Sequence, residues 1–130
     1  MVTEKLAMVG LEGVEEMMPA DLSGGMKKRV GLARAIATDP DVILYDEPTT
    51  GLDPANTKRI CNLIREMQRR LNVTSVVVTH DMEAAFSVTD RMAMISEKRF
   101  GFVGTAEEAR SSDMPVVQRF IRGEMETGEP

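Results

Sequence analysis

The sequence has no tryptophan, and aromatic residues make up only 4% of its 130 residues. Its single cysteine, Cys61, excludes an internal disulfide and indicates a reducing compartment. No apolar stretch approaches the roughly 20 residues that span a bilayer, and no secretory leader is recognisable. The formal net charge of −5 argues against nonspecific nucleic-acid binding, because such binding relies on an excess of Lys and Arg. These absences favour a cytoplasmic protein with no nucleic-acid partner.

With so few aromatic side chains, the 11 methionines and the branched aliphatic residues have to fill the core. Hydrophobic periodicity and cap residues predict one α/β domain of alternating helices and strands. The predicted helices cover residues 3–10, 25–38, 54–71, 81–88 and 114–123, with one more starting at 105; the predicted strands cover 42–46 and 75–79, and 91–96 and 99–103 form a hairpin. The strands at 42–46 and 75–79 show no polar alternation, so we expect a parallel pair, buried on both faces and joined by a right-handed crossover.

A glycine turn precedes the helix at 25–38, in the segment Leu22-Ser23-Gly24-Gly25-Met26. A helix N-terminus carries free N–H groups and a partial positive charge, so it attracts anions. Glycines remove the side chains that would keep a phosphate away from those groups. The segment therefore indicates a phosphate-recognition element, although Ser-Gly-Gly alone would be a weak signal.

Two adjacent carboxylates, Asp46 and Glu47, end the apolar strand at 42–46. A hard carboxylate at a strand's end suits Mg²⁺, which makes Asp46 the candidate metal ligand. The neighbouring Glu47 suits a general base that orients an attacking water. The alternative is that both acids are solvated charges at a strand end, which the buried run before them disfavours.

Together these two segments resemble the signature motif and the Walker B strand of ATP-binding cassette (ABC) ATPases. The resemblance continues through Pro48-Thr49-Thr50-Gly51-Leu52-Asp53-Pro54, similar to the family's D-loop, and Val78-Thr79-His80-Asp81, similar to its switch histidine. It covers residues 22–103 in the family's order and spacing. The fold implied is the C-terminal part of a P-loop NTPase, with parallel strands and flanking helices, part of a helical subdomain, and a C-terminal β-hairpin.

The resemblance also implies roles for individual residues. Glu47 and His80 would be catalytic, with His80 contacting the terminal phosphate, and Asp46 would bind Mg²⁺. Asp53 would lie at a dimer interface, a role compatible with capping a helix. The signature residues would close over ATP held by a second subunit, so the cofactors of the whole protein are ATP and Mg²⁺; these residues are Leu22, Ser23, Gly24, Gly25 and Met26. Met26 replaces the usual glutamine, which removes a polar contact but leaves the helix-terminus amides in place.

The family's phosphate loop, Gly-x-x-x-x-Gly-Lys-Ser/Thr, has no match in the 130 residues. The adenine-stacking aromatic and the Q-loop glutamine also lack counterparts. We therefore expect an ABC ATPase fragment that is inactive alone, binds no ATP or Mg²⁺, and self-associates through uncovered strand edges and apolar faces. The expected divisions are a helical-subdomain remnant at 1–21, the signature helix and C-terminal RecA-like part at 22–123, and a disordered tail at 124–130.

A weaker resemblance suggests a branch of the family. Leu-Ser-Gly-Gly-Met followed by basic residues, and the ending Val117-Gln118-Arg119-Phe120-Ile121-Arg122-Gly123, are similar to ATPases of the phospholipid-trafficking Mla or toluene-tolerance type. This implies a second ATPase subunit, a membrane-embedded permease, a lipid cargo with a lipid-binding protein, and a location on the cytoplasmic face of the inner membrane. Met8, Met17 and Met18 could dock on the permease, but filling a small helical core is the favoured interpretation.

Two other functions stay open at this point. The chain could be the ABC-type head of a DNA-repair or chromosome protein, although no heptad segment precedes the signature and the charge is acidic. It could also be a non-catalytic regulatory or assembly module that keeps the signature without the phosphate loop. The coding sequence upstream would discriminate the three, through a phosphate loop, a coiled coil or a true start at Met1.

Overall fold

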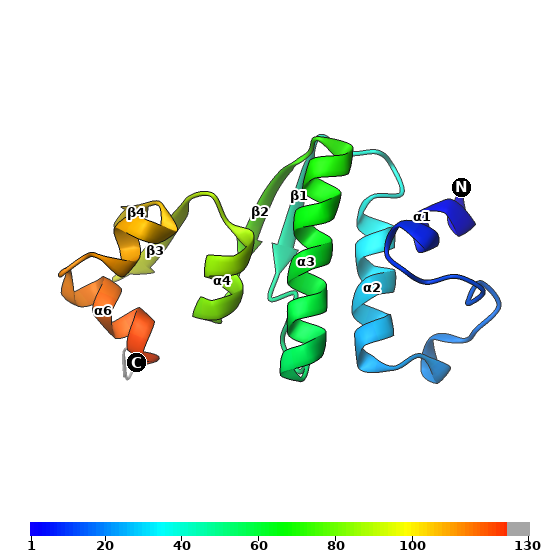
Figure 1. Cartoon of the computed structure of the whole chain (residues 1–130), viewed down its shortest axis with the longest axis horizontal. Helices are drawn as coiled ribbons and strands as arrows, with labels where there is room; N and C mark the ends of the chain where they lie inside the picture. Colours follow the sequence, from blue (N-terminus) through cyan, green and yellow to red (C-terminus); the bar gives the residue numbers. More distant parts are fainter. Residues whose placement is uncertain (125–130) are drawn as a thin grey trace. The chain divides into compact units, whose positions relative to one another are not determined.

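The computed structural model describes residues 1–124, and the chain divides between Thr79 and His80 into two compact units (Figure 1). Each unit is a continuous stretch of sequence. The division does not test the expected boundary between residues 21 and 22, which stays a prediction. The tail expected at 124–130 lies almost wholly outside the described residues. No helix within residues 1–124 is long and apolar enough to cross a membrane.

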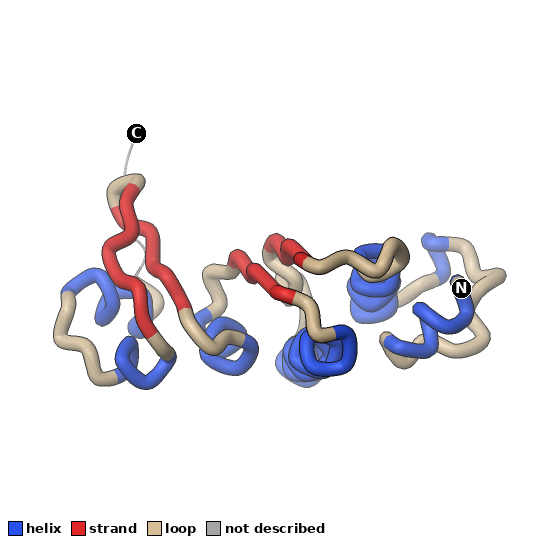
Figure 2. The backbone as a smooth tube through the Cα atoms, turned by 90° about the horizontal axis from the view of Figure 1, so that it is seen from above, coloured by secondary structure: helices blue, strands red, loops and turns tan. Residues whose placement is uncertain are grey.

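The first unit is built around two parallel strands. Strand β1 (Val42–Asp46) pairs with β2 (Thr74–Val78) from Val42↔Thr74 to Asp46↔Val78, as the sequence predicted. The 18-residue helix α3 (Pro54–Leu71) makes the crossover and lies on one side of the strands (Figure 2). The remaining elements precede β1: α1 (Val2–Met8), a 3-10 turn (Pro19–Asp21) and α2 (Gly24–Ala35), which packs beside α3.

Helix α3 owes its position to caps and to one apolar stripe. Asp53 caps its start with Pro54 in the first turn, and Asn72 ends it in the left-handed conformation at φ +52°, both as predicted. The buried positions recur at spacings of three and four, which turns one face of the helix inward. They are Ile60, Cys61, Ile64 and Met67, so Cys61 is the core residue that the sequence indicated.

The prediction that both parallel strands are buried on two faces is wrong. Ile43 is 3% exposed, but its neighbour Leu44 is 76% exposed, and burial alternates along β1. Helices cover one face only, and each strand has a single strand neighbour among the described residues. The apolar residues on the uncovered side are here called the open face: Val42, Leu44, Val76 and Val78.

Helix α2 is shorter than predicted and buries a different set of residues. It ends at Ala35 instead of residue 38, and the buried residues are Leu32, Ala33 and the fully buried Ile36 that follows it. The apolar residues Met26, Val30 and Ala37, which recur with Ala33 at helical spacing in the sequence, are half-buried. The chain turns after Ile36 and reaches Asp39 at φ +49°, whose carboxylate accepts a hydrogen bond from the buried ammonium of Lys5 on α1. This ion pair holds the turn that replaces the predicted last helical turn.

The second unit follows the predicted pattern closely. It contains α4 (Met82–Val88), a hairpin of β3 (Met92–Ser96) and β4 (Arg99–Gly104), α5 (Ala106–Arg110) and α6 (Pro115–Arg122). Both hairpin turn residues, Glu97 and Lys98, have positive φ, as a tight turn requires. The capping box of Thr105 with Glu108 forms as predicted. The unit's core gathers around Met94, Ala109 and Val117.

The methionines near the N-terminus do not form the helical core that the sequence favoured. Met17 and Met18 are 39% and 66% exposed, and Met8 is half-buried. Pro19 begins the 3-10 turn, and the stretch before it forms only turns and bends. Exposure of these residues leaves the docking interpretation open.

The alternating burial of β1 predicts opposite outcomes for adjacent substitutions. Ile43→Ala should lower the free energy of unfolding by about 2–5 kcal/mol, because it empties a buried site against α3. Leu44→Ala should change it by no more than about 0.5 kcal/mol, because the side chain is already in solvent. Urea unfolding of the two variants checks both values. Equal losses in dilute, monomeric solution would contradict the alternating burial along β1.

Candidate functional site

The glycine turn forms the N-terminus of α2, as the sequence predicted. Leu22 follows the 3-10 turn, and Ser23 caps the helix, its Oγ accepting a hydrogen bond from Met26 N at 3.2 Å. Gly24 and Gly25 occupy the first turn. The helix start therefore presents backbone N–H groups with no side chain on its first two residues, a geometry that suits a phosphate.

Asp46 and Glu47 lie at the carboxyl end of β1, but they are held differently. Asp46 is the last strand residue and is exposed, on the same side as Leu44. Glu47 leaves the strand with φ +47°, a conformation that a side chain makes costly. Its N–H donates to the Val78 carbonyl at 2.8 Å, which ties the turn to the end of β2. The chain thus turns directly after Asp46, with Glu47 at the turn.

Two side chains that sequence reasoning did not assign to the site contact Glu47. The Thr50 hydroxyl donates to Glu47 Oε2 at 3.3 Å, and Lys28 Nζ on α2 donates to the Glu47 carbonyl at 3.4 Å. The signal for Thr50 was its place three residues after Glu47 in a turn. Nothing in the sequence distinguished Lys28 from the other basic residues of α2. The Thr50 hydrogen bond orients the Glu47 carboxylate, and the Lys28 hydrogen bond links α2 to the end of β1.

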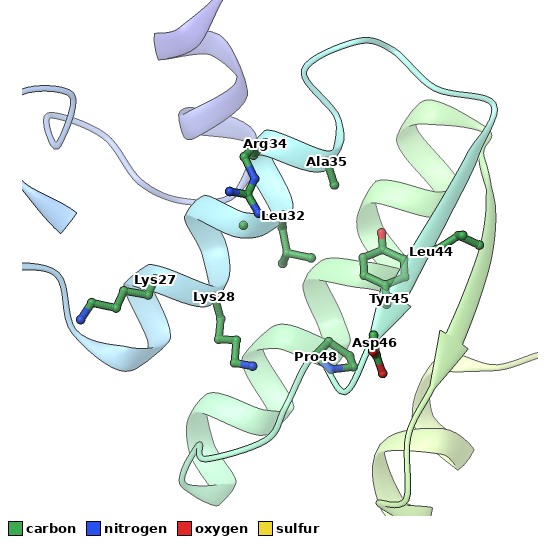
Figure 3. Close-up of a pocket in the computed structure, with 10 residues that line it drawn as sticks. Lys27, Lys28, Leu32, Arg34, Ala35, Leu44, Tyr45, Asp46 and Pro48 are labelled. Atoms are coloured by element: carbon green, nitrogen blue, oxygen red, sulfur yellow. The ribbon is translucent and has the colours of Figure 1, made fainter. Parts of the chain in front are cut away.

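A cavity of about 460 Å³ lies between α2 and β1 (Figure 3). Tyr45, Asp46 and Pro48 line its strand side, and Lys27, Lys28 and Arg34 line its helix side. The three cationic groups do not converge, since the Lys27 and Arg34 side chains extend from different parts of α2 (Figure 3). The cavity is therefore not built as a single anion site.

Asp53 is fully engaged at the start of α3. Its Oδ1 accepts from Asn56 N at 2.9 Å, and its Oδ2 accepts from Asn56 Nδ2 at 2.6 Å. These hydrogen bonds, the backbone one first, lower the pKa of Asp53 below its usual value. The carboxylate is thus charged and oriented by the capping that the sequence indicated, and its expected place at a dimer interface stays a prediction.

The sequence placed His80 at the carboxyl end of the second strand. It follows β2 with one residue between them, is exposed, and is the first residue of the second unit. Its predicted contact with the acidic pair stays a prediction. The part of the site that the first unit assembles by itself contains the signature residues, Asp46, Glu47 and Asp53.

The donor set at the end of β1 fits Mg²⁺. The ion needs one or two protein carboxylates and otherwise keeps water and substrate oxygens, and Asp46 supplies an exposed carboxylate. Within residues 1–124 no three His, Cys, Asp or Glu side chains gather as an all-protein metal cage. Such a sparse set is typical of sites where the substrate completes the coordination.

The lowered pKa of Asp53 predicts a pH-dependent contribution to stability. Because the folded-state pKa lies below the unfolded value of about 3.9, the charge stabilises the fold above that pH and the effect is lost as pH falls through the folded value. Asp53→Asn keeps a capping oxygen without the charge. The wild type should therefore exceed this variant in urea midpoint at about pH 7 and lose that advantage progressively as the pH falls below the unfolded pKa of about 3.9. A difference independent of pH would contradict the role of the charge.

Comparison with known proteins identifies relatives of this arrangement. Residues 2–50 match the family model "ABC transporter". The chain is 47% identical over 124 residues to the intermembrane phospholipid transport system ATP-binding protein MlaF of Haemophilus influenzae, covering 95% of this chain and 47% of that protein. It is 45% identical over 122 residues to the probable ribonucleotide transport ATP-binding protein mkl of Mycobacterium tuberculosis, covering 94% and 34%.

A solved structure agrees with these relatives. The ATP-binding cassette MJ0796, in a dimeric post-hydrolysis state bound to ADP and Pi, superposes with a TM-score of 0.67 at 34% identity, over 78% of this chain and 44% of that one. The chain therefore spans about a third to a half of the length of the relatives that it matches. Fold, motifs and relatives agree that the chain belongs to the ABC transporter ATPase family.

Proposed function

We propose that the chain is part of the ATP-hydrolysing subunit of an ABC transporter. The observation that carries the proposal is the meeting, in one compact unit, of an acidic pair at the end of a parallel strand and a glycine turn at a helix start. Phosphoryl transfer needs a metal ligand, an oriented water and dipoles around the developing charge. Asp46 and Glu47 are residues of the right kind for the first two tasks, and the N-terminus of α2 would supply dipoles to the nucleotide of a second subunit.

The chemical roles divide between two strand ends. Asp46 would hold Mg²⁺, which when bound neutralises charge on the phosphates. Glu47 would accept the proton of the attacking water, with its carboxylate oriented by the Thr50 hydroxyl. His80, just past β2, would contact the terminal phosphate.

The signature residues would act on nucleotide bound by a second subunit. Ser23 Oγ takes up the Met26 N–H, while Gly24 is exposed at the first turn, so an external phosphate can approach the helix start there. The family's phosphate loop has no match in the 130 residues, so an ATP held at Asp46 needs that loop from elsewhere. A dimeric relative that holds ADP and Pi supports this arrangement.

Phospholipid is the proposed cargo. The name of the Haemophilus influenzae relative refers to intermembrane phospholipid transport, and that of the mycobacterial relative to ribonucleotide transport. The resemblance of the ending 117–123 to ATPases of the phospholipid-trafficking type favours the former. The partners would then be a second ATPase subunit, a membrane-embedded permease and a lipid-binding protein, with the ATPase on the cytoplasmic face of the inner membrane.

A chimera tests the catalytic proposal. Residues 1–124 replace the matching segment of the Haemophilus influenzae protein, and Mg²⁺-dependent release of phosphate from ATP is measured. Glu47→Gln should lower kcat at least about 100-fold, because the base that orients water is lost. Glu97→Gln, at the hairpin turn, is the matched control and should leave the rate unchanged.

An unchanged kcat in the Glu47→Gln chimera would show that Glu47 is not the general base. In calorimetry, the 130-residue chain alone should show no binding of MgATP at micromolar nucleotide concentrations. Such concentrations are on the order of the tighter KM values of enzymes. Micromolar binding by the chain alone would contradict the need for a phosphate loop from elsewhere.

We also propose that the chain by itself associates through its open face. Four apolar side chains, each 48–76% exposed, stand side by side on two paired strands. An apolar sheet face of this kind gains free energy when it is removed from water. The outer edges of β1 and β2, which pair with no further strand within residues 1–124, add hydrogen-bonding groups to the same region.

A charge placed on the open face should reduce this association. Leu44→Lys puts an ammonium group at the most exposed of its four side chains, so the weight-average sedimentation coefficient should rise less with concentration than in the wild type. Val2→Lys, at a 62% exposed apolar position on α1, is the matched control. A wild-type chain that stays monomeric at high concentration would contradict the proposal.

A further inference from the structure

The second signature glycine, Gly25 on α2, packs directly against Asn56 on α3. A Cβ placed on Gly25 would lie 3.1 Å from Asn56 Oδ1 and 3.3 Å from Asn56 Cγ. Side chains in proteins rarely approach a Cβ so closely, so a methyl group here would displace the Asn56 amide. At Gly24 the nearest atom to such a Cβ is Leu52 Cδ2, at an ordinary contact distance of 3.9 Å. Crowding by Asn56 is thus particular to position 25.

Asn56 is not free to yield, because Asp53 holds it from the other side. Its Nδ2 donates to Asp53 Oδ2 at 2.6 Å and its backbone N–H donates to Asp53 Oδ1 at 2.9 Å. Hydrogen bonds to a carboxylate are stronger than those between neutral groups. The amide of Asn56 therefore lies between the Asp53 carboxylate, which binds its Nδ2 end, and Gly25, whose side-chain position lies against its Oδ1 end.

We propose that Asn56 is a positioning residue that couples the D-loop carboxylate of Asp53 to the signature turn at Gly25. The two loops are 28 residues apart in sequence, from Gly25 to Asp53, and the chain between them runs through all of β1. The Asn56 side chain connects the two loops directly, because it contacts both Asp53 and Gly25. A shift of the signature turn is then transmitted to Asp53 within the same subunit.

The consequence for function rests on the proposed function above, in which both loops face a second subunit. There, Asn56 keeps the carboxylate and the phosphate-binding turn at a fixed separation, so that one cannot engage without the other. The physical coupling itself needs no nucleotide, and it can be tested on the 130-residue chain. A failed ATPase test would leave the coupling intact, and a failed coupling test would leave the ATPase proposal intact.

The test reads the Asp53 carboxyl by ¹³C NMR during a pH titration. The groups that act on this carboxyl are hydrogen bonds from the first residues of α3, foremost those of Asn56, while burial acts in the opposite direction. Asn56→Ala should raise its pKa part of the way to the usual value, because only the side-chain hydrogen bond is lost. Gly25→Ala should raise it as well, because the new methyl displaces the amide. Gly24→Ala, the matched control, should leave it unchanged.

The double variant Gly25→Ala/Asn56→Ala distinguishes coupling from two separate effects. Its Asp53 pKa should equal that of Asn56→Ala alone, because the amide that carries the effect is gone. Gly25→Ala should lower the melting temperature in the wild-type background and raise it in the Asn56→Ala background, where alanine's helix preference is unopposed. An unchanged Asp53 pKa in Gly25→Ala, or the same sign of the melting shift in both backgrounds, would overturn the proposal.

Discussion

The first unit depends on the parallel pairing of β1 with β2. Five residue pairs align in register, and the Glu47 N–H extends the ladder by donating to Val78 beyond the last strand residue of β1. A parallel pair requires a long crossover, which α3 supplies. Both strands therefore end at the same edge, and the pairing sets where the acidic residues after β1 lie.

The helix caps and helix ends could be predicted from the sequence, because the residues that form each of them lie within a few positions of one another. Asp53 before Pro54 begins a helix, Thr105 with Glu108 closes a capping box, and Gly123 ends α6 in the left-handed conformation. At Asp53 and Thr105 a side chain satisfies backbone N–H groups at a helix start, and Gly123 adopts a conformation that its missing side chain makes easy. Such interactions need no knowledge of the remaining fold.

Features that depend on distant residues could not be predicted in the same way. The early end of α2 involves Lys5, which lies 34 residues before its partner Asp39. The exposure of Leu44 depends on which elements cover the sheet. An apolar strand has the same sequence pattern whether one of its faces or both are covered, so the pattern does not distinguish the two cases. For the site, the sequence indicated Asp46 and Glu47 as neighbours, but not the contacts that Thr50 and Lys28 make with Glu47, nor the contact of Asn56 with Asp53.

The division between Thr79 and His80 has a consequence for how the chain emerges from a ribosome. Domains fold as units, the N-terminal one first, and each unit here is continuous in sequence. Both strands and their crossover are synthesised before the hairpin exists. The apolar side of the nascent sheet is therefore presented early, as a surface for chaperones to recognise during translation.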